Sequence, residues 1–112
     1  MAYEIILTEE AKAQLKQLRA VDRGKVGSAI DQHLRFEPKR ESKSRIKRLR
    51  RISSPQYRLR VDELRVYYDV EANEVRVIAV VPKAASATWL ETHGTADPAQ
   101  SPEAKEDDNE NN

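Results

Sequence analysis

Cysteine is absent from the 112 residues, and the chain has only two histidines and three glycines. Without cysteine the chain has no disulfides, no thiolate zinc sites and no cysteine nucleophile. Because His33 and His93 are the only histidines, we expect no metal site, and no motif indicates a cofactor. Gly24-Lys25 lacks the glycine-rich loop that precedes the lysine of a P-loop.

Long apolar runs are also missing. The longest run, Val77 to Val81, is far shorter than a membrane span. The opening residues Met-Ala-Tyr-Glu contain no apolar stretch, so we expect no secretory signal. These absences favour a small soluble domain of cytoplasmic location that has no membrane partner.

The formal net charge of +1 combines a basic body with an acidic C-terminal segment. Residues 95–112 carry six acidic side chains and one lysine, which leaves 19 basic and 13 acidic side chains in residues 1–94. Residues 35–65 alone hold twelve Lys or Arg against four Asp or Glu. A concentrated basic segment indicates a phosphate partner, and therefore nucleic acid, with a solvated charged surface as the alternative.

The C-terminal segment, residues 95–112, contains no apolar residue larger than alanine. Such a segment cannot bury enough surface to offset the entropy of ordering it. We therefore predict a folded domain of residues 1–94 followed by a disordered acidic tail. We expect the tail to be a solubilising extension. The alternative is that it folds back onto the basic body through charge attraction.

The spacing of apolar residues indicates a strand and then two helices. Residues 3–7 form a short β-branched run, and Thr8 suits the N-cap of a helix with apolar side chains at positions 11, 15 and 18. Asp22 is expected to cap a second helix that Pro38 ends, and the short connection predicts an antiparallel helical hairpin. The apolar face of this second helix comprises Val26, Ala29, Ile30, His33 and Leu34.

The apolar period changes from helical to alternating after residue 44. Residues 45–49 predict a weakly patterned strand, and residues 56–61 and 64–70 predict two clearly alternating strands. Residues 75–81 are nearly all apolar, as in a central strand that is covered on both faces. Residues 84–91 favour a short final helix. The order predicts an α+β fold in which an N-terminal strand and an α-helical hairpin pack on a twisted antiparallel β-sheet.

An Asp-Glu pair alone separates the two alternating strands, which predicts a two-residue turn and fixes the register. In that register Arg60 is opposite Arg65, and Arg58 is opposite Tyr67. Two arginines directly opposite each other destabilise a hairpin, and such a conflict is typical of a functional site. Guanidinium groups suit phosphate, and neutralisation by nearby acids is the alternative. Replacing Arg65 by alanine is therefore expected to leave stability unchanged or slightly raised.

The segment from Ser44 to Val81 resembles the core of the RelE/ParE superfamily of bacterial type II toxins. The family pattern is a basic segment, then Tyr-Arg-hydrophobic-Arg, a tight turn, Arg-hydrophobic-x-Tyr and an apolar last strand. Residues 46–49, 57–60 and 65–68 supply the first, second and third of these motifs. The opening YEIILTEEAKAQL and the two helices are also similar to the family, so the resemblance covers about residues 3–92.

The resemblance implies a RelE-like toxin that is neutralised by an antitoxin protein encoded by the adjacent gene. RelE-like members cleave mRNA in the ribosomal A site, with the 2′-hydroxyl of the substrate as nucleophile. The implied function is therefore that of an endoribonuclease, an mRNA interferase that acts with the ribosome and mRNA as partners and inhibits translation. The alternative is a ParE-like inhibitor of DNA gyrase, or a non-catalytic member that only binds its antitoxin.

The resemblance also implies roles for individual residues. Arg58 and Arg60 correspond to the strand cations of the RelE-like site, and Arg65 corresponds to its phosphate-binding arginine. Arginine does not deprotonate in proteins, so proton transfer needs other groups, and Lys83 and His93 complete the candidate catalytic set. The family often has a Tyr or His-Tyr where this chain has Thr-Trp-Leu at residues 88–90, which favours the alternative function. The residues expected to bind RNA are Arg45, Lys47, Arg48, Arg50, Arg51, Tyr67 and Trp89.

Overall fold

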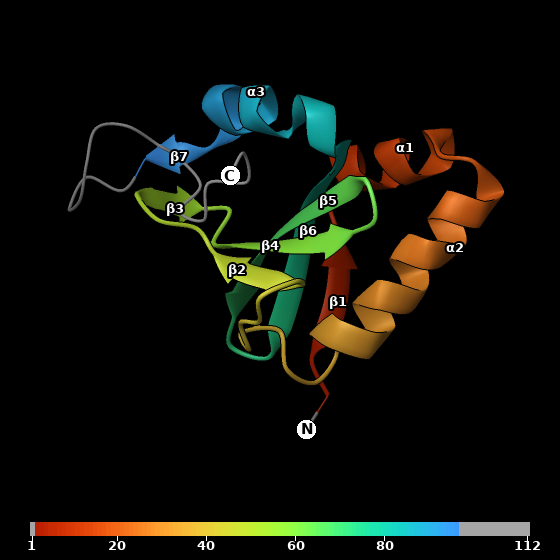
Figure 1. Cartoon of the computed structure of the whole chain (residues 1–112). Helices are drawn as coiled ribbons and strands as arrows, with labels where there is room; N and C mark the ends of the chain where they lie inside the picture. Colours follow the sequence, from red (N-terminus) through yellow and green to blue (C-terminus); the bar gives the residue numbers. More distant parts are fainter. Residues whose placement is uncertain (1, 97–112) are drawn as a thin grey trace.

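The computed structural model describes residues 2–96, which form a mixed five-stranded sheet with helices on both faces and a second sheet of two strands (Figure 1). The large sheet has the spatial order β1 (Glu4–Leu7), β6 (Glu74–Pro82), β5 (Leu64–Glu71), β4 (Tyr57–Val61) and β2 (Ile46–Arg48). The small sheet pairs β3 (Ile52–Ser54) with β7 (Thr95–Ala96). The helices are α1 (Glu9–Gln17), α2 (Ala20–Ala29), the single π-helical turn η1 (Ile30–Leu34) and α3 (Lys83–His93).

The first helices begin close to where the sequence predicts them. The Thr8 hydroxyl accepts a hydrogen bond from the backbone N of Ala11 at 3.1 Å, which confirms the predicted N-cap of α1. Helix α2 begins at Ala20 with Arg19 as its N-cap, so the prediction that Asp22 caps it is wrong by three residues. Asp22 lies in the first turn of α2 and pairs with Arg19 at 3.3 Å, a position where an acid also favours the helix dipole.

The main core lies between α1, α2 and one face of the sheet. The alternating strands β4 and β5 contribute Leu59, Val66 and Tyr68 to it, and α2 contributes Val26, all of them fully buried. The Tyr68 hydroxyl donates to the backbone oxygen of Pro38 at 2.6 Å and so ties the chain after η1 to the sheet. Four of the five residues of the predicted face of the second helix belong to this core, and the exception is His33, which is half-buried and lies outside it.

The predicted antiparallel sheet is confirmed for β2, β4, β5 and β6, and the N-terminal strand β1 joins it in parallel to β6, with Glu4 opposite Glu74. Tight turns fix the antiparallel direction of β4–β5 and β5–β6. No turn links β1 to its neighbour, and alternation within a strand predicts which face is buried but not the strand's direction. The sheet is therefore mixed, within the predicted α+β class.

The interior strand β6 contains a β-bulge at Ile78. Tyr67 pairs with Ala79 but Tyr68 pairs with Val77, which leaves Ile78 as the extra residue. Helix α1 satisfies the interrupted ladder, because Thr8 Oγ1 donates to the Ile78 oxygen at 2.8 Å and Gln14 Oε1 accepts from the Val80 nitrogen at 2.6 Å. The predicted apolar central strand is confirmed, and the bulge fixes where α1 docks on it.

The second face of the sheet is covered by α3, which lies above β5 and β6 in Figure 1. The small sheet of β3 and β7 borders α3, and neither of these short strands was predicted. Ile52 pairs with Ala96, so Thr95 and Ala96 belong to the folded body and not to the predicted tail. The remainder of the predicted tail, residues 97–112, lies outside the described residues. No helix within residues 2–96 is long and apolar enough to cross a membrane.

Candidate functional site

The β4–β5 hairpin has the register that its two-residue turn predicts, with Arg60 opposite Arg65 and Arg58 opposite Tyr67. Asp62 in the turn has φ 53°, a left-handed conformation that a short polar side chain tolerates. Lys47 of β2 pairs with Arg58 and therefore points to the same side of the sheet. We call the outer surface of these strands, with the loop that joins β2 to β3, the cationic face. Its members are Lys47, Arg50, Arg51, Arg58, Arg60 and Arg65.

The cations of this face differ in exposure. Arg58 and Arg65 are each only 1% exposed, whereas Arg60 and Lys47 are half-buried and Arg50 and Arg51 are exposed. Nη1 of Arg65 donates to the backbone oxygens of Asp62 and Leu64, both at 3.0 Å, which holds its guanidinium against the turn. In each of two rows of the sheet, Lys47–Arg58 and Arg60–Arg65, the cationic face therefore has one half-buried and one almost fully buried cation.

A second apolar cluster adjoins the cationic face and contains Tyr67 and Trp89, two of the residues expected to bind RNA. The Tyr67 ring stacks on the Trp89 ring, and the Trp89 ring stacks on the His93 ring, with 5.1 Å between centroids in both pairs. Trp89 Nε1 also donates to Glu10 Oε2 at 3.0 Å. Tyr67 is fully buried and Trp89 is 8% exposed, so in this arrangement their rings hold α3 on the sheet.

The two proton-transfer candidates lie at opposite ends of α3. The backbone nitrogen of Lys83 donates to the oxygen of Glu63 at 2.7 Å, which places the start of α3 beside the β4–β5 turn and Arg65. His93 ends the same helix, about 15 Å away at a rise of 1.5 Å per residue. The structure therefore brings Lys83 to the hairpin turn and keeps His93 away from it.

Two more of the predicted RNA-binding residues lie off the cationic face. Arg48 pairs with Tyr57 and lies over its ring, 5.4 Å from the centroid, while its Nη1 donates to the backbone oxygens of Leu49 and Gln56 at 2.9 Å. Arg45 donates to the backbone oxygen of Arg60 at 3.4 Å and lines a groove on the helical side. Lys47, Arg50 and Arg51 are the cations of this set that remain on the face.

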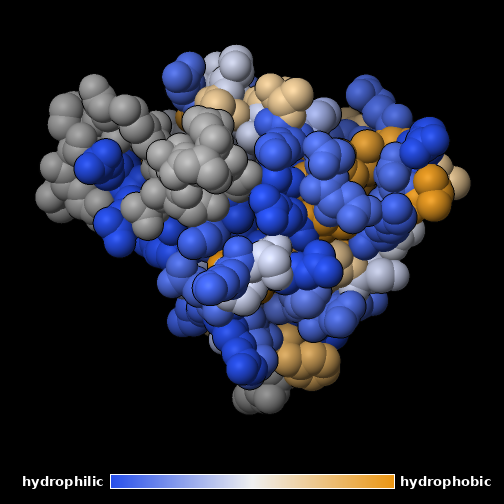
Figure 2. Space-filling model, viewed as in Figure 1, coloured by the Kyte–Doolittle hydropathy of each residue, from blue (hydrophilic) through white to orange (hydrophobic). Residues whose placement is uncertain are grey.

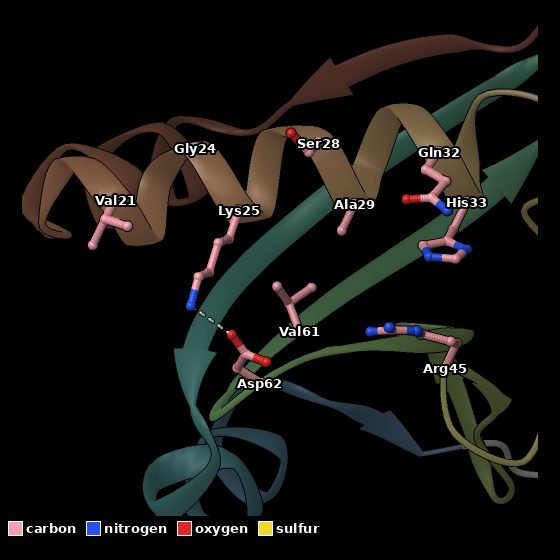
Figure 3. Close-up of a pocket in the computed structure, with 10 residues that line it drawn as sticks. All are labelled: Val21, Gly24, Lys25, Ser28, Ala29, Gln32, His33, Arg45, Val61 and Asp62. Atoms are coloured by element: carbon pink, nitrogen blue, oxygen red, sulfur yellow. Dashed lines mark hydrogen bonds and ion pairs between the residues drawn. The ribbon is translucent and has the colours of Figure 1, made fainter.

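The groove between α2 and the edge formed by β4 and β2 was not predicted from the sequence (Figure 3). It has a volume of about 510 Å³, and a smaller hollow of about 430 Å³ continues it along η1, with Gln32, His33 and Arg45 common to both. Lys25 bridges it to the hairpin turn through an ion pair with Asp62 at 3.0 Å. Burial lowers the pKa of His33 below its ordinary value, and the charge of Arg45 lowers it further.

The groove carries the two most exposed large apolar side chains of the described residues, Val21 at 56% and Phe36 at 60%, one in each hollow. Gly24 and Gly27 of α2 have open space where a Cβ would stand, although glycine in a helix costs about 1 kcal/mol relative to alanine. Of the two, Gly24 lines the groove, and it is the sequence signal for it, because nothing within the described fold requires a glycine there. Within residues 2–96 no three His, Asp or Glu side chains are grouped to hold a metal ion.

Comparison with known proteins gives the same fold. No protein-family model matches the sequence, and a search of curated proteins also finds no match. Among solved structures, the chain is similar to one in the archaeal RelE–RelB complex from Pyrococcus horikoshii OT3, with 20% identity, a TM-score of 0.54, and coverage of 74% of this chain and 97% of that chain. It is also similar to one in the RelB–RelE antitoxin–toxin complex from Methanococcus jannaschii, with 15% identity, a TM-score of 0.58, and coverage of 75% and 96%. The chain therefore has a RelE-like fold.

Proposed function

We propose that this chain is the toxin of a type II toxin–antitoxin system and that it cleaves mRNA on the ribosome in the cytoplasm, which inhibits translation. The observation that carries the proposal is the cationic face on a RelE-like fold, where Arg60 lies directly opposite Arg65. Stability alone would favour an opposite-charge or aromatic pair at these two positions. The solved chains with this fold come from toxin–antitoxin complexes, which supports the toxin role.

In the proposed reaction the 2′-oxygen of the RNA attacks the adjacent phosphorus and the bond to the 5′-oxygen breaks. A base takes the 2′ proton, and an acid supplies a proton to the leaving 5′-oxygen. The product ends are a 2′,3′-cyclic phosphate and a free 5′-hydroxyl. Arginine side chains stabilise the charge that develops on the phosphate but transfer no proton.

The exposure of each cation indicates whether it contacts the phosphate directly or stabilises its charge from within the protein. Lys47 and Arg60 are half-buried and so reach a phosphate directly, in the same rows as Arg58 and Arg65. Arg58 and Arg65 lie beside them and are almost fully buried, where a low local dielectric strengthens the field of a fixed charge. They are preorganised by the fold, so they need little rearrangement when negative charge develops above them.

Lys83 is the proton-transfer group that this geometry favours. It is exposed and begins α3 beside the turn that holds Arg65, whereas His93 lies at the far end of the helix. The proposed site is therefore the turn end of the cationic face.

We further propose that the antitoxin docks in the groove along α2 and η1. Val21 and Phe36 offer apolar contacts at its two ends, and Gly24 allows a partner's backbone to approach α2 closely. A helix is the matching partner element, because residues 21–36 extend about 22 Å at helical rise. Val21→Asp and Phe36→Asp should leave the toxin folded, because both side chains are exposed, and should weaken antitoxin binding at least tenfold in titration calorimetry.

One observation favours the second candidate, a gyrase inhibitor or a non-catalytic antitoxin binder. The rings of Tyr67 and Trp89 stack on each other, so neither is presented to an RNA base in this arrangement. A binder of this kind would use the charge of the cationic face without proton transfer.

Primer extension on mRNA after induction of the chain without antitoxin tests the proposal. We expect growth arrest with new 5′ ends in translated messages, and no new ends when translation is blocked. Arg60→Ala should abolish the cuts, while Arg76→Ala, at the far end of the sheet from the β4–β5 turn, should not. Arrest with intact mRNA and a DNA-damage response would identify the gyrase inhibitor instead.

A further inference from the structure

We propose that the acidic segment of residues 97–112 docks on the cationic face of its own chain and competes there with phosphate. The segment carries six acids and one lysine, a net charge of −5. The cationic face gathers six cations on β2, β4, β5 and the loop before β3. The docking itself does not depend on the proposed function, whereas the competition with RNA rests on it.

Strand β7 ends directly before this segment and lies next to the loop of the cationic face. Ala96 pairs with Ile52, and Arg50 and Arg51 directly precede Ile52 in the chain. Both arginines are exposed, and the first acid, Asp97, directly follows Ala96. The pairing of β3 with β7 therefore holds Ala96, the residue that precedes the acidic segment, on the strand that directly follows these two cations.

The segment is long enough to reach the rest of the face. Sixteen residues span up to about 50 Å when extended, and the largest dimension of the molecule is 37 Å. A short tether of this kind gives an effective concentration in the millimolar range, so contacts that are weak singly still compete with a ligand in solution. The last five acids, at positions 103–110, can therefore meet Arg60 at the centre of the face.

The strength of this docking is limited and depends on salt. An exposed ion pair contributes about 0.2–1 kcal/mol, and such pairs are screened over about 10 Å at 0.1 M salt. Because the segment has no apolar residue larger than alanine, ion pairs are its main source of binding energy here. The segment therefore lowers the affinity of the cationic face for polyanions at low salt. A polyanion that carries more phosphate groups displaces it.

A spin label tests the docking without RNA. The chain has no cysteine, so Asn111→Cys gives a single attachment site. We expect the label to broaden the backbone amide signals of Arg60 and Arg51 at low salt, and not those of Val21 and Gly24 on α2. High salt, or the replacement of all six acids of the segment by their amides, should remove the broadening. Uniform broadening over both sets of amides would overturn the proposal.

A binding measurement tests the competition, with a fluorescent single-stranded RNA as the probe. Asp107→Asn with Asp108→Asn should raise affinity about fivefold at low salt, and the gain should vanish at high salt. Glu4→Gln with Glu71→Gln removes the same charge from the opposite end of the sheet and should change affinity less than twofold. Equal gains in both variants would show a general charge effect and overturn the competition. If no variant binds RNA, the proposed function fails, and the spin label still decides the docking.

Discussion

Arg60 and Arg65 lie directly opposite each other on β4 and β5, yet Arg60 is half-buried whereas Arg65 is 1% exposed. The two guanidinium groups are therefore held differently, although they share one row of the sheet. Arg65 Nη1 satisfies the backbone oxygens of Asp62 and Leu64, so its side chain is part of the hairpin turn. These contacts lead us to expect a loss of stability when Arg65 is removed, in place of the unchanged or slightly raised stability expected from the sequence.

We predict that Arg65→Ala lowers the free energy of unfolding by about 2–4 kcal/mol, because it leaves a cavity and two carbonyl oxygens without this donor. Arg60→Ala should change it by about 0.5 kcal/mol or less, in either direction. Chemical denaturation followed by circular dichroism measures both values. A fully stable Arg65→Ala variant would mean that the like-charge repulsion exceeds the contribution of these hydrogen bonds.

Trp89 should be the main anchor of α3. Trp89→Ala removes the middle ring of the Tyr67–Trp89–His93 stack and should cost about 3–5 kcal/mol of unfolding free energy. Trp89→Phe keeps a ring but loses the hydrogen bond to Glu10, at a cost of about 1–2 kcal/mol beyond the change in ring size. Urea denaturation of wild type, Trp89→Phe and Trp89→Ala measures their unfolding free energies, which should decrease in that order. Equal stability of wild type and Trp89→Ala would contradict the packing of α3 on β5.

The bulge in β6 predicts a large effect from one glutamine. Gln14→Ala leaves the Val80 nitrogen without the acceptor that the side chain supplies, and should cost about 1–3 kcal/mol. Gln17→Ala is the matched control on α1, because its side chain is exposed, and should stay within about 0.5 kcal/mol of wild type. Thermal unfolding compares the two variants. A loss that is the same for both would show that helix propensity, and not the bulge, is responsible.

Tyr68 should make the free energy of unfolding depend on pH in the alkaline range. Burial raises the pKa of its hydroxyl above the usual value of about 10, and burial also raises the pKa of Tyr57, against the opposing charge of Arg48. Above about pH 10 a tyrosine ionises in the unfolded chain but stays protonated in the fold, so stability is full below that pH and falls above it. Tyr68→Phe should cost about 1 kcal/mol at pH 7, through the lost bond to Pro38, and should reduce the alkaline loss. Denaturation at pH 8, 10 and 11 tests this; an unchanged alkaline loss in Tyr68→Phe would refute it.

The parts of the fold that the sequence could predict are those that local patterns determine. The two-residue turn and the alternation of β4 and β5 fix which residues face each other, so the pairing of Arg60 with Arg65 follows from sequence alone. The parallel direction of β1 and the pairing of Ile52 with Ala96 depend on residues far apart in the chain. No local periodicity contains that information.

The candidate site was predictable to the same extent. Alternation places Arg58, Arg60, Arg65 and Tyr67 on one side of the hairpin, and the structure agrees. It does not predict that Arg58 and Arg65 are buried or that Tyr67 stacks on Trp89. The exposure of a side chain on a sheet depends on which other elements pack over it. Helix α3 packs on this face through tertiary contacts, which local sequence patterns do not predict.

The pairing of Glu4 with Glu74 determines when the sheet can be completed while the chain is being synthesised. Strand β1 is synthesised first, but its neighbour in the sheet, β6, is synthesised late. Strand β6 also lies between β1 and the β4–β5 hairpin that bears Arg60 and Arg65. Contacts between residues so far apart slow folding, because a long loop must close before they form. A nascent chain therefore holds an unfinished sheet until residue 82 has emerged, and the proposed toxic activity can begin only after that.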